Sequence, residues 1–319
     1  MIFHEYFGEW VEAYKVGAVA DTTLRKYRLT HKSLRELAPT LDLQALDRRE
    51  YQKLINDYAF THEKLTTLDF HRHLRACLLD AYDEKIIERD PTRKAVIRGK
   101  MPAEKKAKYL NKDELEKLLQ VLPLRLDSLG IDWLILLLAK TGLRFAEGLA
   151  LTPGDFDFTN KKIRVNKTWN YKSKTDRGFM PTKNQSSIRD ITIDSSLADQ
   201  FEQLVEGLPA DEPFFFDKQV RVFNATLNDY LKERCISAGV PVISLHSLRH
   251  THASVLLAAG VSIPSVSKRL GHSKVSTTQD TYIHIIKELE EKDNNKAMDC
   301  MASLQGGGVD GSMEAVCDI

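Results

Sequence analysis

The sequence predicts a mainly α-helical protein with a small antiparallel β-sheet: an N-terminal helical bundle followed by an α+β domain. Residues 1–90 repeat apolar side chains every three or four positions, which is the period of an amphipathic helix. Residues 155–193 instead alternate polar and apolar side chains in short runs, which is typical of strands. Residues 91–109 contain two prolines and a glycine that interrupt any periodicity. A chain of 319 residues is long enough for two domains.

The first predicted domain, residues 1–90, is a bundle of four or five helices. Phe3, Phe7, Trp10 and Tyr14 recur at spacings of three and four, so they share one apolar face. The same spacing recurs in three further segments before residue 90, and no strand-like alternation interrupts it. Residues 1–90 therefore contain enough amphipathic helices to bury a core of their own.

The second predicted domain, residues 110–286, begins with helices. Asn111 followed by Glu114 is a capping-box pattern that starts a helix. The run from Trp133 to Ala139 is apolar on every side, so the helix that contains it is expected to be buried.

Three strands are expected in the middle of this domain. Residues 155–158 and 162–168 form a predicted hairpin, because both alternate and an Asn-Lys pair can turn between them. A third strand is expected at 188–193, after a long polar loop at 169–187. Helices are then expected at 196–207, 219–238, 245–259, 262–270 and 276–286.

Charge is distributed unevenly along the chain. The formal net charge is only +1, which on its own argues against a polyanion partner. Residues 91–109, however, contain seven basic residues and one acid, and residues 287–319 have a net charge of −5. The basic segment is an interdomain linker that is either a solvated tether or a strap over a polyanion. The acidic tail is expected either to be disordered or to dock on a neighbouring protomer.

Two protein classes are excluded by composition. The longest apolar stretches, such as 133–139 and 253–261, are far too short to span a bilayer. The four cysteines are scattered and form no CxxC pair, so neither a disulfide framework nor a cysteine-based zinc site is expected.

Four short motifs in the second domain contain the residues that could carry chemistry. They are Thr141-Gly-Leu-Arg-Phe-Ala-Glu147, His246-Ser-Leu-Arg-His-Thr-His252, Leu270-Gly-His272, and Tyr282 ten residues further on. Taken singly, Arg144 is typical of a surface ion pair, His272 of a helix cap and Tyr282 of a core side chain. His246 and His250 have the spacing of a zinc pair, but Ser247 stands where a metalloprotease needs glutamate, so no metal site is expected.

Taken together, these motifs strongly resemble the tyrosine recombinase (phage integrase) family. The resemblance is densest in TGLRFAEGLAL at 141–151 and in the forty residues from HSLRHTHAS to TYIHI at 246–285. The N-terminal helical segment also looks like the family's core-DNA-binding domain, so the likeness covers nearly all of residues 1–290. It implies a two-domain clamp around double-stranded DNA and a reaction that uses no cofactor and no metal.

The resemblance also implies roles for individual residues. Tyr282 would attack the scissile phosphate, and Arg144 and Arg249 would hold its non-bridging oxygens. His246 would exchange the tyrosine proton, and His272 would hydrogen-bond a phosphate oxygen. Glu147 would orient its neighbours.

The family's general-acid lysine is assigned to Lys183, which would protonate the leaving 5′-hydroxyl. Lys183 lies in a Pro-Thr-Lys-Asn segment just before the third strand, as in the family pattern, although the family often has threonine where Asn184 stands. Lys167, Lys172 and Lys174 lie in the same strand-and-loop region and remain alternatives.

DNA backbone contacts are expected from basic residues of the first domain and the linker, and from one strand arginine that could instead simply decorate the sheet. The candidates are Arg25, Lys26, Arg28, Arg93, Lys94, Arg98, Lys100, Lys105, Lys106 and Arg189.

The implied activity is a site-specific DNA recombinase that integrates or excises a phage or other mobile element in the cytoplasm of a bacterium. The family works as a homo-tetramer on two paired sites, through a Holliday junction, and accessory DNA-bending or excision proteins are further candidate partners. A type IB-like topoisomerase or resolvase is the alternative within the same chemistry. A catalytically silent DNA-binding regulator of the same fold is the alternative from another class.

Overall fold

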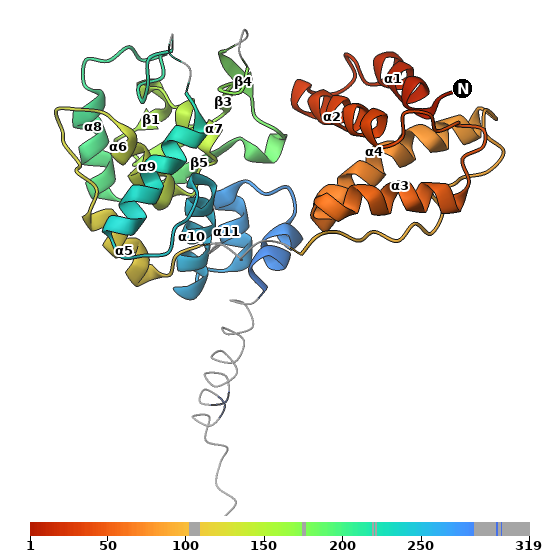
Figure 1. The fold of residues 1–319 in the computed structure, drawn as a ribbon. Coiled ribbons are helices and arrows are strands. Elements are labelled where there is room, and N and C mark those ends of the chain that lie inside the picture. The colour runs from red at the N-terminus through yellow and green to blue at the C-terminus, as the bar shows by residue number, and fades with distance from the viewer. Residues whose placement is uncertain are drawn as a thin grey trace, which may run out of the picture. The chain divides into compact units, whose positions relative to one another are not determined.

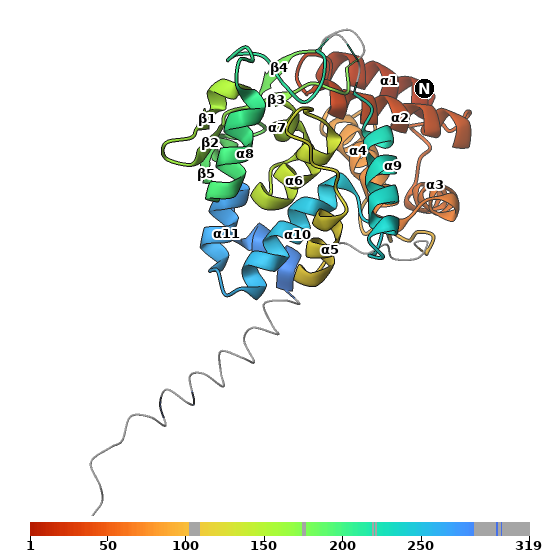
Figure 2. The same ribbon diagram turned by 90° about the vertical axis from the view of Figure 1, so that its left-hand side faces the viewer.

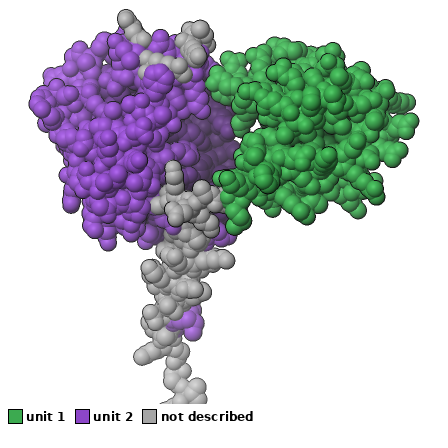
Figure 3. Space-filling model, viewed as in Figure 1, with its two compact units in different colours: residues 1–105 green, residues 106–319 purple. Residues whose placement is uncertain are grey.

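The computed structural model describes residues 1–101, 109–173, 177–218, 220, 222–283, 298 and 301. The chain divides into two compact units, residues 1–105 and residues 106–319 (Figure 3). Lys105, Lys106 and Lys174 lie outside the described residues, as does the tail 287–319 apart from Met298 and Met301.

Unit 1 is built from four helices, as the sequence predicts (Figure 1). The helices are α1 (Phe3–Tyr14), α2 (Asp21–Leu37), α3 (Arg48–Thr61) and α4 (Lys64–Asp83). The Asp47 side chain caps α3 by accepting hydrogen bonds from the backbone N–H groups of Arg49 (2.7 Å) and Glu50 (2.9 Å). Phe7, Trp10 and other apolar side chains from α1, α3 and α4 form its buried core. Each such side chain contributes about 1.5–3 kcal/mol of transfer free energy when buried.

Unit 2 is mostly helical and contains two small antiparallel sheets, so the predicted fold class is confirmed. Its helices are α5 (Lys112–Gln120), α6 (Ile131–Thr141), α7 (Phe145–Leu149), α8 (Ser195–Val205), α9 (Asn224–Ser237), α10 (Leu245–Ala258) and α11 (Ile263–Leu270). A further helical stretch covers 275–283. Buried apolar side chains cover every side of α6, and α10 packs on it, which places α6 at the centre of the unit.

The first sheet has the order β1-β2-β5, with β1 (Phe156–Asp157), β2 (Lys162–Val165) and β5 (Arg189–Thr192). Phe156 lies opposite Ile163, and Ile163 lies opposite Ile191, so the predicted hairpin and third strand are confirmed. α11 packs beside β5 (Figure 2), and this contact brings the end of α11 next to the sheet.

The second sheet was not predicted. β3 (Lys167–Trp169) pairs with β4 (Phe179–Pro181), within the region that the sequence suggested was a continuation of the hairpin and a polar loop. The three residues of β4 are all exposed and show no inside–outside alternation, so the period-two signal of a strand is missing there.

Candidate active site

Two left-handed glycine turns position the motif residues of unit 2. Gly142 (φ 68°) ends α6 just before Arg144, and Gly271 (φ 69°) ends α11 just before His272. Glycine adopts this backbone conformation at a lower energetic cost than residues that carry a Cβ. A Cβ at Gly142 would also lie 2.6 Å from Cδ2 of His252, so a larger residue would not fit there. The two glycines therefore determine where α6 and α11 end and where the residues that follow them lie.

Arg144 precedes α7, and its guanidinium lies among acceptors from three segments. It donates to Glu147 Oε1 (2.6 Å), to Ser187 Oγ (3.3 Å) and to the carbonyl of Gly271 (3.2 Å). The side chain is 29% exposed, so Arg144 is held in place and still accessible from solvent.

Arg249 lies on α10 and joins the two glycine turns. Its buried guanidinium donates to the carbonyls of Gly142 (2.8 Å) and Leu270 (2.5 Å). Burial, together with the positive charge of Arg144, lowers the pKa of Arg249 to about 9, so it still carries its charge at neutral pH.

Arg189 was a candidate for a DNA phosphate contact, and this interpretation is wrong. The side chain is buried, and its nitrogens donate to the carbonyl of Arg269 (2.6 Å), the carbonyl of Ser187 (2.8 Å) and Glu147 Oε2 (3.0 Å). Arg189 shares the inward face of β5 with Ile191, so strand alternation could have indicated its burial.

Glu147 is the carboxylate that pairs with both Arg144 and Arg189, and it is 1% exposed. Burial alone would raise the pKa of Glu147, but the charges and hydrogen bonds of Arg189 and Arg144 outweigh it and lower the pKa. With Arg249 nearby, three guanidinium groups share one described carboxylate, which leaves this cluster with excess positive charge.

Tyr282 lies on the helical stretch 275–283 and is almost fully buried, within a cluster that includes Leu257 of α10 and Leu270 of α11. Its hydroxyl is 2.9 Å from Nδ1 of His250. Burial raises the pKa of Tyr282 to about 12, and the charge of Arg249 opposes this rise. His246 was expected to exchange the tyrosine proton, but the histidine bonded to Tyr282 is His250, one helical turn further along α10.

His246 and His272 are two further histidines near Arg249 and Arg144. His246 is exposed on α10, and its ring meets that of His250 edge-on, with 5.1 Å between centroids. Partial desolvation and the charges of Arg249 and Arg144 lower the pKa of His246. Nδ1 of His272 is 2.8 Å from Thr278 Oγ1, and desolvation with the same two arginines lowers its pKa to about 4. His272 is therefore a neutral ring at pH 7 that can donate one N–H.

The candidate lysines have different surroundings. Lys183 is exposed between β4 and the 3₁₀ turn Gln185–Ser187. Its neighbour Asn184 accepts a hydrogen bond from Ser187 Oγ (3.0 Å), and Ser187 is itself bonded to Arg144. Lys167, by contrast, is engaged with the buried carboxylate of Asp155 at 2.5 Å.

The described residues provide no support for the remaining lysine candidates or for a metal site. Lys172 is exposed with its ammonium 5.6 Å from the ring centroid of Tyr171, and Lys174 is not described. No group of three His, Cys, Asp or Glu side chains within the described ranges is arranged to hold a metal ion.

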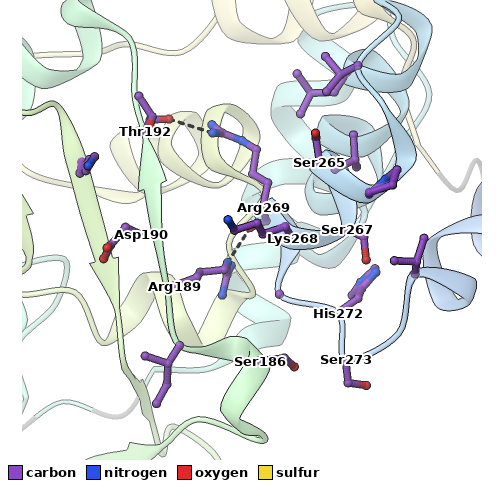
Figure 4. Close-up of a pocket in the computed structure, with 18 of the residues that line it drawn as sticks. Ser186, Arg189, Asp190, Thr192, Ser265, Ser267, Lys268, Arg269, His272 and Ser273 are labelled. Carbon is purple, nitrogen blue, oxygen red and sulfur yellow. Dashed lines mark hydrogen bonds between the residues drawn. The ribbon is translucent and has the colours of Figure 1, made fainter.

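A cavity of about 1060 Å³ adjoins the cluster on the sheet side of His272 (Figure 4). In this view Arg269 donates to the carbonyl of Thr192 (2.9 Å), and Arg189 donates to the carbonyl of Arg269. Arg269 Nε also donates to Nε2 of buried His252, whose Nδ1 is 2.9 Å from the carbonyl of Ala139. These contacts tie α6, α10, α11 and β5 together behind the catalytic candidates.

The basic candidates of unit 1 that are described are all exposed. They are Arg25, Lys26, Arg28, Arg93, Lys94, Arg98 and Lys100. Lys26 and Arg28 make only long ion pairs, with Asp69 (3.8 Å) and Glu12 (3.6 Å). Exposed pairs of this kind contribute little to stability, so both side chains can exchange partners at low cost.

Comparison with known proteins decides the family. The model of the phage integrase family matches residues 108–288, which is more than half of the chain. The chain belongs to the phage integrase family. The integrase of Staphylococcus phage L54a is 26% identical over 92% of this chain and 92% of its own length. A XerC-like tyrosine recombinase of Caldanaerobacter subterraneus is 31% identical over 75% of this chain and 66% of its own.

Solved integrase structures share the fold of this integrase. The Tn1549 transposon integrase, in complex with a circular intermediate DNA, matches with a TM-score of 0.72, 17% identity, and coverage of 92% of this chain and 99% of that one. A λ integrase dimer bound to a core site matches with a TM-score of 0.62, 15% identity, and coverage of 88% and 77%. The resemblance inferred from the motifs is thereby confirmed, and the integrase is an enzyme of the tyrosine recombinase type.

Two features of the integrase site were missed in the sequence. His250 was considered only as a metal ligand, although its spacing of four from His246 places both on one helix face. Ser187 links Arg144 to Asn184, but no local sequence pattern marks it as part of the site, because serine is common in turns of every kind.

In the described ranges, no helix is long and apolar enough to cross a membrane.

Proposed function

We propose that this integrase cleaves one DNA strand with Tyr282 and rejoins strands through a 3′-phosphotyrosyl intermediate. The observation that carries the proposal is the excess positive charge of Arg144, Arg249 and Arg189, of which Arg249 acts directly on Tyr282. Like charges held together in a partly buried site disfavour one another until an anion neutralises them. A phosphodiester supplies that anion, and Tyr282 supplies the nucleophile.

The roles follow from what each group can donate. Arg144 and Arg249 hold the non-bridging oxygens, because guanidinium groups match phosphate geometry and stay charged. His246 and His272, with their lowered pKa values, donate N–H bonds as neutral rings. The Tyr282 O–P bond forms as the bond from phosphorus to the 5′-oxygen breaks, so the phosphodiester energy is retained and rejoining needs no ATP.

Lys183 is proposed to protonate the leaving 5′-oxygen, supported by its exposure and by the hydrogen-bond chain from Asn184 through Ser187 to Arg144. Lys183→Ala is expected to slow cleavage about 10²–10⁴-fold on an ordinary strand. A 5′-bridging thio substrate, whose leaving group needs no acid, is expected to be cleaved at close to the wild-type rate. Single-turnover cleavage of both substrates measures this, and equal losses on both would redirect the assignment to Lys172 or Lys174.

Exchange between two duplexes needs four cleavages and one tyrosine for each, so a homo-tetramer on two paired sites, passing through a Holliday junction, is proposed as the working assembly. The acidic tail is a candidate contact between protomers, and accessory DNA-bending or excision proteins are candidate partners. Mass photometry of the protein on paired duplex sites counts the protomers. A count of four supports the proposal, and a stable assembly of two that completes exchange contradicts it.

A mobile element in a bacterial cytoplasm is the proposed context. It is supported by the integrases of Staphylococcus phage L54a and of ICEBs1 from Bacillus subtilis, the second being 28% identical over 75% of this chain. The described exposed basic residues of unit 1, together with Lys105 and Lys106, are proposed to bind the DNA backbone. When these residues neutralise DNA phosphates, counterions are released, so binding should be steeply salt-dependent. DNA-binding titrations at several salt concentrations measure this dependence.

Covalent trapping tests the proposed reaction. A binding site is first selected from random duplexes, and a nick beside the cleavage point then prevents religation. In EDTA, a covalent protein–DNA band is expected, and the DNA-linked peptide should contain Tyr282. Binding without any adduct would favour the silent regulator, and relaxation of supercoiled plasmids lacking a second site would favour a topoisomerase.

A further inference from the structure

His250 is a titratable residue at the centre of the candidate site, and the proposed mechanism leaves it without a role. Its Nδ1 is 2.9 Å from the Tyr282 hydroxyl, which is hydrogen-bonding distance to the reacting oxygen. Its ring is half-buried, with centroids 5.9 Å from that of Tyr282 and 5.1 Å from that of His246.

We propose that His250 is the general base that takes the proton of Tyr282 during attack, which rests on the proposed function of Tyr282. The O–H bond of Tyr282 breaks as the Nδ1–H bond of His250 and the O–P bond form. The bond from phosphorus to the 5′-oxygen breaks, and Lys183 provides the proton for that oxygen. In religation, the imidazolium of His250 returns its proton to the departing tyrosine oxygen.

The other histidines are less suited to this step. Nδ1 of His272 is already bonded to Thr278 Oγ1 at 2.8 Å. His246 is exposed on α10, and its ring lies perpendicular to that of His250, so it is one ring removed from the tyrosine contact. A general base must lie within about 2.6–3.2 Å of the atom whose proton it takes, and His250 meets that condition.

The charges around His250 change when DNA binds. His250 contacts His246 on its own helix and Tyr282 on the stretch 275–283, and its charge acts on His272 after α11. The charges of Arg249 and Arg144 act on both of these neighbouring histidines. In the free protein this set is positive. A bound phosphate adds negative charge, which stabilises the imidazolium that forms as the tyrosine proton arrives.

His250→Asn separates proton transfer from positioning. The amide oxygen of asparagine occupies nearly the place of Nδ1, so it can accept the Tyr282 hydrogen bond but cannot take the proton. Single-turnover cleavage of the nicked substrate is expected to slow about 10²–10⁴-fold with DNA affinity unchanged. The wild-type rate should rise with pH as a histidine deprotonates, and this rise should be absent in the variant.

A more acidic nucleophile makes the test decisive. Trifluorotyrosine at position 282 ionises more readily, so it should recover part of the rate lost in His250→Asn. A normal rate and pH profile in His250→Asn, or a slow variant that trifluorotyrosine does not help, would overturn the proposal.

A matched control exists in unit 1, where Tyr51 and His71 form the same kind of pair at 2.8 Å. His71→Asn is expected to cleave at the wild-type rate. Failure of the proposed function would give a different result. Tyr282→Phe would then still form the covalent adduct, whatever the behaviour of His250→Asn.

Discussion

Tyr282→Phe is expected to form no covalent DNA complex, while its DNA affinity and folding stability stay near those of the wild-type protein. Phenylalanine keeps the buried ring, which lies among Leu257, Leu270 and other apolar side chains. It removes the one oxygen that can attack phosphorus. The hydrogen bond to His250 is lost as well, which costs only about 0.5–1.5 kcal/mol.

The control for this loss is Tyr51→Phe. Tyr51 is also fully buried and bonded to a histidine, so the substitution removes the same chemical group from unit 1. Trapping on the nicked substrate should be abolished in Tyr282→Phe and unchanged in Tyr51→Phe. An adduct that survives in Tyr282→Phe would mean that another side chain is the nucleophile.

The helices and the sites at their ends could be predicted from local patterns. In both motifs a helix-ending glycine stands just before the site residue, Arg144 or His272. These positions could be predicted because a left-handed helix end, as at Gly142 and Gly271, depends on local sequence alone. The buried helix around Trp133 was equally visible, since a helix that is apolar on all sides must lie inside.

The contacts between segments could not be predicted in the same way. Strand alternation can indicate that Arg189 points inward, but it does not identify Glu147, more than forty residues earlier, as the carboxylate that pairs with it. The Tyr282–His250 contact joins two segments 32 residues apart. Such contacts depend on how α10, α11 and the stretch 275–283 pack, and a local periodicity does not contain that information.

Glu147→Gln is expected to lower the free energy of unfolding by about 3–5 kcal/mol, because it leaves the guanidinium of Arg189 buried without a counter-charge. Glutamine has nearly the same shape and can still accept one hydrogen bond, so the loss reports on charge rather than on volume. Asp190→Asn is the control, since Asp190 pairs with Arg164 on the exposed face of the same sheet. That exposed pair should contribute at most about 1 kcal/mol.

Fluorescence of Trp133 and Trp169 during denaturant unfolding, in a Trp10→Phe background, follows unit 2 alone. Arg189→Met added to Glu147→Gln should recover part of the lost stability, because the orphaned charge is removed with its partner. If the two substitutions are simply additive, the pair is not coupled as the geometry indicates.

The pH dependence of stability provides a second check. The lowered pKa of Glu147 means that its contribution is present at neutral pH and is lost as the pH falls through that pKa. The difference between wild type and Glu147→Gln should therefore shrink in acid, since a protonated glutamate also lacks the charge that holds Arg189.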